Sequence, residues 1–339
     1  MPNLAKLRPR GIASLACLCL AATTSSAARA QTTVSHSGDL PAVPTWLFPL
    51  NPPSNGAEPA IDQVTPVHLS GSQRVFTEAQ LNDLFYAPDW YPDSHSAMPD
   101  IVLRGRAPTT FACGYCHSPS GQGRPENASL AGLPAAYIVQ QVADMKSGAR
   151  GSAWHGGPYR PVDLMRKVAA NASDADVIAA ADYFAAQTLR PRVTVIERAR
   201  IPRMRVIGWV YALDPHGGHE ALGQRLIEWS PDPSRHERRD DVMRYTVFVS
   251  PGSVKRGRRI ATTGQDAGAQ ACSSCHGAHL QGVGLIPPLA GRSPTYLMRQ
   301  LVAFQTGDRA GAAAAPMQPV AAKLSLADMI AVAAYAGSL

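Results

Sequence analysis

The sequence predicts a mainly α-helical protein made of two tandem copies of one helical unit, with a small β-rich module between them. The motif C-x-x-C-H occurs twice, beginning at Cys113 and at Cys272, 159 residues apart. The same shift aligns residues 130–150 with 289–309 without a gap, which indicates an internal repeat. Apolar residues recur at helical spacing in both blocks. At 339 residues, the chain is long enough for two domains of ordinary size.

The first thirty residues predict a secretory signal peptide. Basic residues from Lys6 to Arg10 precede an apolar run over 11–22, and Ala28-Arg29-Ala30 is typical of a cleavage site after Ala30. The apolar run is too short to cross a bilayer, and no later segment approaches ~20 uninterrupted apolar residues. We therefore expect an exported, periplasmic protein without a transmembrane segment.

Charge and cysteine content narrow the classes of function. The formal net charge is +7, and the four positive charges within residues 1–30 leave +3 after export, which does not indicate a nucleic-acid partner. Four cysteines remain after export, in two pairs of identical spacing. An even number of exported cysteines usually indicates disulfides, but the histidine that follows each pair points to other chemistry.

Residues 31–75 form a second N-terminal segment, rich in Pro, Ser and Gly, for which we expect little regular structure. Its run Trp46-Leu47-Phe48 is available to anchor it on a domain. Thr77 to Gln80 resembles a capping box that opens a short helix through Tyr86. The segment carries no chemistry that we can assign.

The two motifs are Cys113-Gly114-Tyr115-Cys116-His117 and Cys272-Ser273-Ser274-Cys275-His276. Two thiols at this spacing can add to the two vinyl groups of one haem, and the adjacent histidine then reaches the iron. A Cys₄ zinc site or a redox-active cysteine pair would not explain a histidine at the same place twice. We therefore predict two covalent haems c, attached through Cys113, Cys116, Cys272 and Cys275, with His117 and His276 as iron ligands.

The repeat also suggests the second ligand of each iron. After residue 150 the shift becomes 152, and Met165 then aligns with Met317. A thioether suits haem iron and raises its reduction potential. Each methionine is expected in a loop ahead of a helix whose N-cap is Ser173 or Ser325. The longer loop of the first copy also offers His155, which we keep as an alternative to Met165.

Residues 193–252, between the copies, have the composition of a β-rich module. Its role is expected to be that of a structural bridge, with a docking face formed by Trp209, Trp229 and the cluster 235–239 as the alternative. We place the first helical domain at 76–192 and the second at 253–339, and expect His216, His219 and His236 at surface turns. The expected strands lie within Val193 to Ile196, Met204 to Leu213, Arg225 to Trp229 and Tyr245 to Val249.

The haem motif, followed by Leu-Ala-Gly, Tyr, Gln, Gly-x-Arg, Met and an Ala/Tyr-rich helix, resembles the class I cytochrome c fold. The tandem arrangement is similar to the dihaem cytochrome c4 type, over roughly residues 95–190 and 253–339. In that family the carbonyl of a proline accepts a hydrogen bond from the ring N–H of the ligating histidine. Pro287 fits this place, whereas the first copy has Ala128, so we expect the first histidine to be held differently.

The function expected from these features is single-electron transfer between redox partner proteins, because two His/Met-ligated irons have no open position for a substrate. The resemblance suggests a terminal oxidase as acceptor. One alternative is a dihaem enzyme of the peroxidase or thiosulfate dehydrogenase type, in which one haem is open. Another is the cytochrome subunit of a periplasmic dehydrogenase, with the β-rich module as its interface.

Overall fold

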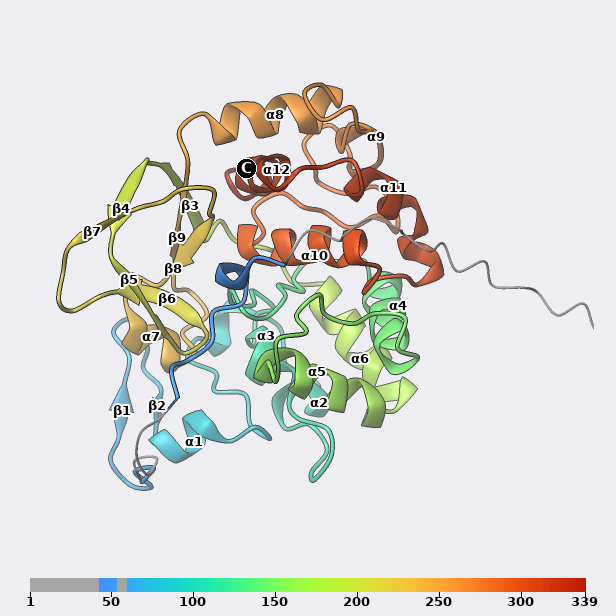
Figure 1. The fold of residues 1–339 in the computed structure, drawn as a ribbon. Helices are drawn as coiled ribbons and strands as arrows, with labels where there is room; N and C mark the ends of the chain where they lie inside the picture. The colour runs from blue at the N-terminus through green and yellow to red at the C-terminus, as the bar shows by residue number, and fades with distance from the viewer. Residues whose placement is uncertain (1–42, 54–59) are drawn as a thin grey trace, which may run out of the picture. The chain divides into compact units, whose positions relative to one another are not determined.

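The computed structural model describes residues 43–53 and 60–339 (Figure 1). The predicted signal peptide and its cleavage site after Ala30 lie outside the described residues. The described residues all belong to one compact unit of the chain.

The first copy of the repeat consists of α2 (Asp100–Leu103), α3 (Cys113–His117), α4 (Ala135–Lys146), α5 (Arg160–Asn171) and α6 (Asp174–Ala185). Helix α6 begins where the sequence predicts, because the Ser173 hydroxyl accepts a hydrogen bond from the backbone N–H of Asp176. Helices α4 and α6 pack on each other. Their apolar faces bury Ile138 and Phe184 in one core cluster.

The second copy consists of α8 (Ser253–Thr263), α9 (Ser273–His276), α10 (Pro294–Thr306), the 3₁₀ helix η3 (Ala312–Met317), α11 (Gln318–Ala321) and α12 (Leu326–Gly337). Ser325 caps α12 in a capping box with Asp328. Helices α8 and α12 cross at Gly257, where an added Cβ would clash with the carbonyl oxygen of Ala331. Only glycine permits this close approach.

The positions of the two candidate methionines differ from the expected loops. Met165 lies inside α5, and Met317 is the last residue of η3. Helix α5 starts early because Pro161 stands in its first turn and Asp163 accepts a hydrogen bond from the backbone N–H of Tyr159. The extra loop of the first copy therefore ends before the methionine.

The segment between the copies contains a five-stranded sheet of order β3-β9-β8-β6-β5. Strand β3 is parallel to β9, and β6 is parallel to β8, while the other neighbours are antiparallel. Helices account for 38% of the residues that the structure describes, so the expectation of a mainly α-helical protein is not confirmed. The elements are β3 (Val193–Glu197), β4 (Arg200–Pro202), β5 (Met204–Ile207), β6 (Val210–Leu213), β7 (His219–Ala221), β8 (Ile227–Trp229), α7 (Pro233–Glu237) and β9 (Tyr245–Val249), with β4 and β7 forming a separate ribbon.

The N-terminal segment contributes to the core of the second copy. Leu47 and Phe48 are buried together with residues of α10 and α12. Thr77 forms the predicted capping box with Gln80, but the helix that it opens ends at Asn82. The elements of this region are η1 (Thr45–Leu47), β1 (Val67–His68), β2 (Val75–Phe76), α1 (Glu78–Asn82) and η2 (Pro92–Ser94).

None of the helices in the described part of the chain is by itself long and apolar enough to cross a membrane. The segments Ala312–Ala321 and Leu326–Gly337 meet that standard only as a pair, which is bent by 117°. In the structure, α12 packs against α8 and α10 in the largest core cluster.

Candidate functional site

The first C-x-x-C-H motif forms the short helix α3, which places both thiols and the imidazole on one turn. The ring nitrogen Nδ1 of His117 lies 2.7 Å from the carbonyl oxygen of Ala128. A carbonyl can only accept, so Nδ1 carries the hydrogen and Nε2 keeps its lone pair. Burial lowers the pKa of His117, which favours this neutral imidazole. A neutral imidazole with a fixed tautomer is the form that binds a metal.

The second motif repeats this arrangement in α9. Nδ1 of His276 lies 2.8 Å from the carbonyl oxygen of Pro287, the residue that the sequence singled out. The expectation that the first histidine is held differently is wrong. The acceptor in both copies is a backbone carbonyl, so alanine serves as well as proline when the loop has the same course.

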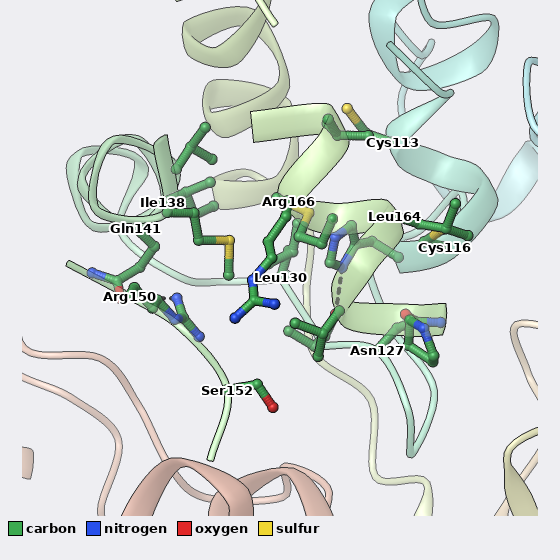
Figure 2. A pocket seen from close by; sticks show the side chains of 18 of the residues that line it. Cys113, Cys116, Asn127, Leu130, Ile138, Gln141, Arg150, Ser152, Leu164 and Arg166 are labelled. Atoms are coloured by element: carbon green, nitrogen blue, oxygen red, sulfur yellow. Dashed lines mark hydrogen bonds between the residues drawn. The ribbon is translucent and has the colours of Figure 1, made fainter. Parts of the chain in front are cut away.

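A cavity of about 180 Å³ opens beside α3 in the first copy, which is room for several water molecules. Its wall includes the motif residues Cys113, Cys116 and His117 together with Met165. Figure 2 shows the sulfur atoms of the two cysteines on the right of this cavity and Arg150 on the left. Most of the remaining wall is apolar, with Leu130, Ile138 and Phe184 among its residues.

Two methionines line this cavity, and the sequence singled out only one. Met165 enters from α5 and Met145 from α4. The sequence by itself favours core packing for Met145, which lies within the helical repeat and corresponds to Phe304 in the second copy. The alternative ligand His155 does not line the cavity: its side chain is 70% exposed and Nε2 lies 3.1 Å from a carboxylate oxygen of Asp308.

The second motif is more open to solvent than the first. Cys275 is exposed, whereas Cys116 is half-buried. Met317 packs on Phe304, Ala314 and Ala321, in a small cluster beside the main core.

The four cysteines have the chemistry expected of attachment points. All are free of disulfides, and the two pairs lie on separate helices, α3 and α9. Among the described residues, no group of three or more His, Cys, Asp or Glu side chains could hold a metal ion, so a Cys₄ zinc site is not formed. Burial raises the pKa of Cys113 to about 12, so its sulfur is a neutral thiol rather than a free thiolate.

A cluster of tyrosine, glutamine and arginine side chains joins the two copies, and its members are related by the repeat. Arg150 donates to Oε1 of Gln141 at 2.8 Å in its own copy, and to the hydroxyl of Tyr296 at 2.9 Å in the other. Arg309 mirrors it across the interface, at 2.7 Å from the hydroxyl of Tyr137. These tyrosine, glutamine and arginine residues recur in the sequence repeat, but we assigned them no role from the sequence. The arginine found at the equivalent position of both copies is the signal that indicates a shared function.

The charge of this cluster is not balanced by protein carboxylates. Both arginines are buried, and neither forms an ion pair with any Asp or Glu in the described ranges. Burial raises the pKa of Tyr296, but the charges of Arg150 and Arg309 more than offset this and leave it below its ordinary value. Arg150 also lines the cavity, so its guanidinium can bind an anionic group placed there.

Helix α7 and the residues after it contact the first motif and the loop that follows it, which corrects two expectations about the β-rich module. His236 is buried rather than at a surface turn, and its Nε2 lies 2.7 Å from a guanidinium nitrogen of Arg124 and 2.9 Å from the carbonyl oxygen of Gly208. The guanidinium of Arg239 lies 3.5 Å from the centre of the Tyr115 ring and donates to the Tyr115 carbonyl at 3.2 Å. This part of the cluster 235–239 therefore faces the protein's own first copy rather than solvent.

The second copy of the repeat matches a known protein family. A profile of the cytochrome c family matches residues 254–339. Cytochrome c-554(547) of Halothiobacillus neapolitanus is 39% identical over 87 residues, which cover 96% of that protein and 23% of this chain. The chain belongs to the cytochrome c family.

Longer matches cover about two thirds or more of this cytochrome c. A thiosulfate dehydrogenase electron acceptor of Thiomonas intermedia is 27% identical over 267 residues, covering 78% of this chain and 89% of that protein. A cytochrome c4 of Pseudomonas aeruginosa is 28% identical over 229 residues, covering 66% and 81%. A solved thiosulfate dehydrogenase of Marichromatium purpuratum is 26% identical with a TM-score of 0.46, and the match covers 70% of this chain and 39% of that one.

This cytochrome c carries two covalently bound haems c and transfers electrons, in the manner of the dihaem cytochrome c4 type. The residues of the first site fit a haem. An apolar cavity holds two free thiols and a neutral imidazole, with a thioether in its wall and a buried arginine without a carboxylate partner. The second motif has the same histidine geometry.

Proposed function

We propose that this cytochrome c is an exported dihaem carrier that exchanges single electrons with redox partner proteins in the periplasm. The observation that carries the proposal is the arrangement of candidate ligands around the first cavity, where His117 and Met165 line the same space and His155 does not. With an imidazole and a thioether as ligands, the iron has no open position for a substrate.

The residues assigned to the two haems follow from the repeat. Cys113, Cys116, Cys272 and Cys275 form the thioether bonds, His117 and His276 ligate the irons, and Met165 and Met317 complete the coordination. When bound, each haem supplies an iron that cycles between the ferric and ferrous states. The protein orients each imidazole through a backbone carbonyl and keeps water away from the first iron with the apolar cavity wall.

Arg150 and Arg309 are assigned to the carboxylates of the haem propionates. Two buried guanidiniums that share only tyrosine and glutamine acceptors need negative charge nearby, because an unpaired buried charge is costly. Since the two arginines also hold the copies together, the same side chains would fix the position of each haem relative to the other copy.

The proposed electron donor is a thiosulfate-oxidising dehydrogenase. Support for this comes from the relatives in Thiomonas intermedia and Stutzerimonas stutzeri that are named thiosulfate dehydrogenase electron acceptor. A terminal oxidase is the proposed acceptor, by similarity to the cytochrome c4 type. Catalysis by the chain itself, as a peroxidase or a thiosulfate dehydrogenase, would need one iron without its sixth ligand.

Visible spectroscopy of the purified holoprotein tests this function. We expect two haems per chain, a methionine-to-ferric-iron charge-transfer band, and no binding of carbon monoxide by the reduced protein. Met165→Leu should remove about half of the band and open one haem to carbon monoxide, whereas Met145→Leu, the matched control in the same cavity, should leave both unchanged. Carbon monoxide binding by the unaltered protein would instead favour an enzyme.

A further inference from the structure

The loop that follows each C-x-x-C-H motif is buried in the first copy and largely exposed in the second. In the first copy, every residue from 118 to 126 is buried. In the second copy, the 159-residue shift places the equivalent loop at 277–285, and Val283 and Leu285 are 57% and 66% exposed. Ile286, the next residue, is 38% exposed. Large apolar side chains at these exposures, adjacent along one loop, form an apolar surface patch.

The loop of the first copy is covered by the β-rich module of the same chain. The hydroxyl of Ser120 donates to a carboxylate oxygen of Asp241 at 2.6 Å. Arg124 donates to the ring of His236 at 2.7 Å and to its carbonyl oxygen at 3.1 Å. A protein surface therefore occupies this face of the first copy, held by buried polar contacts.

The second loop differs in sequence from the first loop at the positions that are buried in the first copy and exposed in the second. The polar side chains that anchor the module have no equivalents there, so the second loop lacks the groups that hold the module on the first loop. The residues Ser120, Arg124 and Glu126 of the first loop correspond to His279, Val283 and Leu285 of the second. The motif itself shows the same difference between the copies. Tyr115 stacks against Arg239 of the module, whereas the equivalent residue of the second motif, Ser274, is exposed.

Charge around the exposed loop favours an acidic partner. No Asp or Glu occurs between residues 267 and 307. Helix α8 packs beside α9 (Figure 1), and it exposes Lys255 and Arg258 to solvent. The surface is thus apolar at the loop, with positive charge on the neighbouring helix. The acidic residue that precedes this stretch, Asp266, is paired with Arg259 of α8.

We propose that the loop 277–286 is the docking surface for a redox protein whose contact face is apolar at its centre and bordered by carboxylates. The β-rich module occupies the equivalent face of the first copy, so exchange with that partner is directed to the second copy. This inference rests on the proposed function as an electron carrier. Exposed Cys275, an attachment point of the second haem, lies in the same motif that leads into the loop.

The experiment uses a surface of known composition as the partner. The holoprotein is adsorbed on gold coated with a mixed monolayer of methyl- and carboxylate-terminated alkanethiols, and the interfacial electron-transfer rate is measured by cyclic voltammetry. Leu285→Glu and Val283→Glu should each lower the rate about tenfold or more, because each removes apolar contact and adds repulsion. Val283→Glu is included because it should not disturb the haem pocket of the second copy. The equivalent residue of the first copy, Arg124, does not line the cavity there.

Leu213→Glu is the matched control, since Leu213 is 45% exposed on β6, in the β-rich module. Its rate should change less than twofold, although it carries the same added charge. The docking surface is refuted if the control loses as much activity as the loop variants, or if the loop variants behave like the unaltered protein. Reduction by dithionite and reoxidation by ferricyanide are measured in solution in parallel. An unaltered protein that fails this cycle would overturn the carrier function itself, and with it the docking proposal.

Discussion

Removal of one hydroxyl from the Tyr–Gln–Arg cluster should weaken the contact between the two copies by a predictable amount. In Tyr296→Phe, Arg150 loses an acceptor at 2.9 Å but keeps Gln300 at 3.0 Å and Gln141 at 2.8 Å. A hydrogen bond to a charged group contributes about 1.5–3 kcal/mol. Because two acceptors remain, we expect a loss in the free energy of unfolding near the lower limit, about 1.5 kcal/mol.

The repeat makes the same prediction for the mirror-image residue. Tyr137→Phe removes an acceptor at 2.7 Å from Arg309, which keeps Gln141 at 2.7 Å. The two variants should therefore lose stability by similar amounts, as expected for a cluster with approximate two-fold symmetry. Tyr335→Phe is the control, because no hydrogen bond to the Tyr335 hydroxyl is formed by the described residues.

Urea unfolding of the holoprotein, followed by far-ultraviolet circular dichroism and by the haem absorbance, measures these losses. The two probes should give coincident transitions in the unaltered protein. In the variants the midpoint should fall with little change in slope. The reasoning is refuted if both variants lie within about 0.5 kcal/mol of the control, the usual range for surface substitutions.

Three further changes probe other parts of the structure. Phe48→Ala should cost about 3–5 kcal/mol in urea unfolding, because this ring is 2% exposed and is the apolar anchor of the N-terminal segment; a loss below about 1 kcal/mol would mean that the segment is not anchored there. Arg239→Gln, which removes a half-buried positive charge stacked on Tyr115, should lower the reduction potential of one haem and leave the other unchanged in a spectroelectrochemical titration; equal shifts of both haems would contradict this. Burial and the charge of Arg124 hold the pKa of His236 well below 6.5, so the unfolded chain binds this proton more readily and stability is lost as the pH falls below about 6.5. His236→Gln should therefore reduce the difference in urea midpoint between pH 7.5 and pH 5.5, and an unchanged difference would exclude His236 as its source.

The features that the sequence predicted well depend on short-range chemistry. The two C-x-x-C-H motifs each form a single helical turn, because the spacing of their side chains is a property of five consecutive residues. The N-caps at Ser173 and Ser325 and the capping box at Thr77 were predicted for the same reason. Each is a contact between residues three positions apart, and the chain needs no tertiary partner to make it.

The features that the sequence missed depend on which segments meet. The first motif histidine finds a carbonyl at Ala128 although proline is absent, because the loop follows the same course in both copies. His236 looked like a surface residue, yet α7 lies against the loop after the first motif and buries it. Composition does not reveal such a contact, since the same residues would be solvated if the module packed elsewhere.

By itself, the sequence determined the cofactor class, the attachment residues to be tested and the existence of two copies, since all three follow from spacing and repetition along the chain. Tertiary structure decided that Met165, and not His155, lines the cavity beside His117. It also decided that Arg150 and Arg309 meet across the interface, and that the β-rich module covers the loop after the first motif. These outcomes depend on distances between residues far apart in the chain, which are fixed only when the apolar faces of the helices and the sheet are buried together.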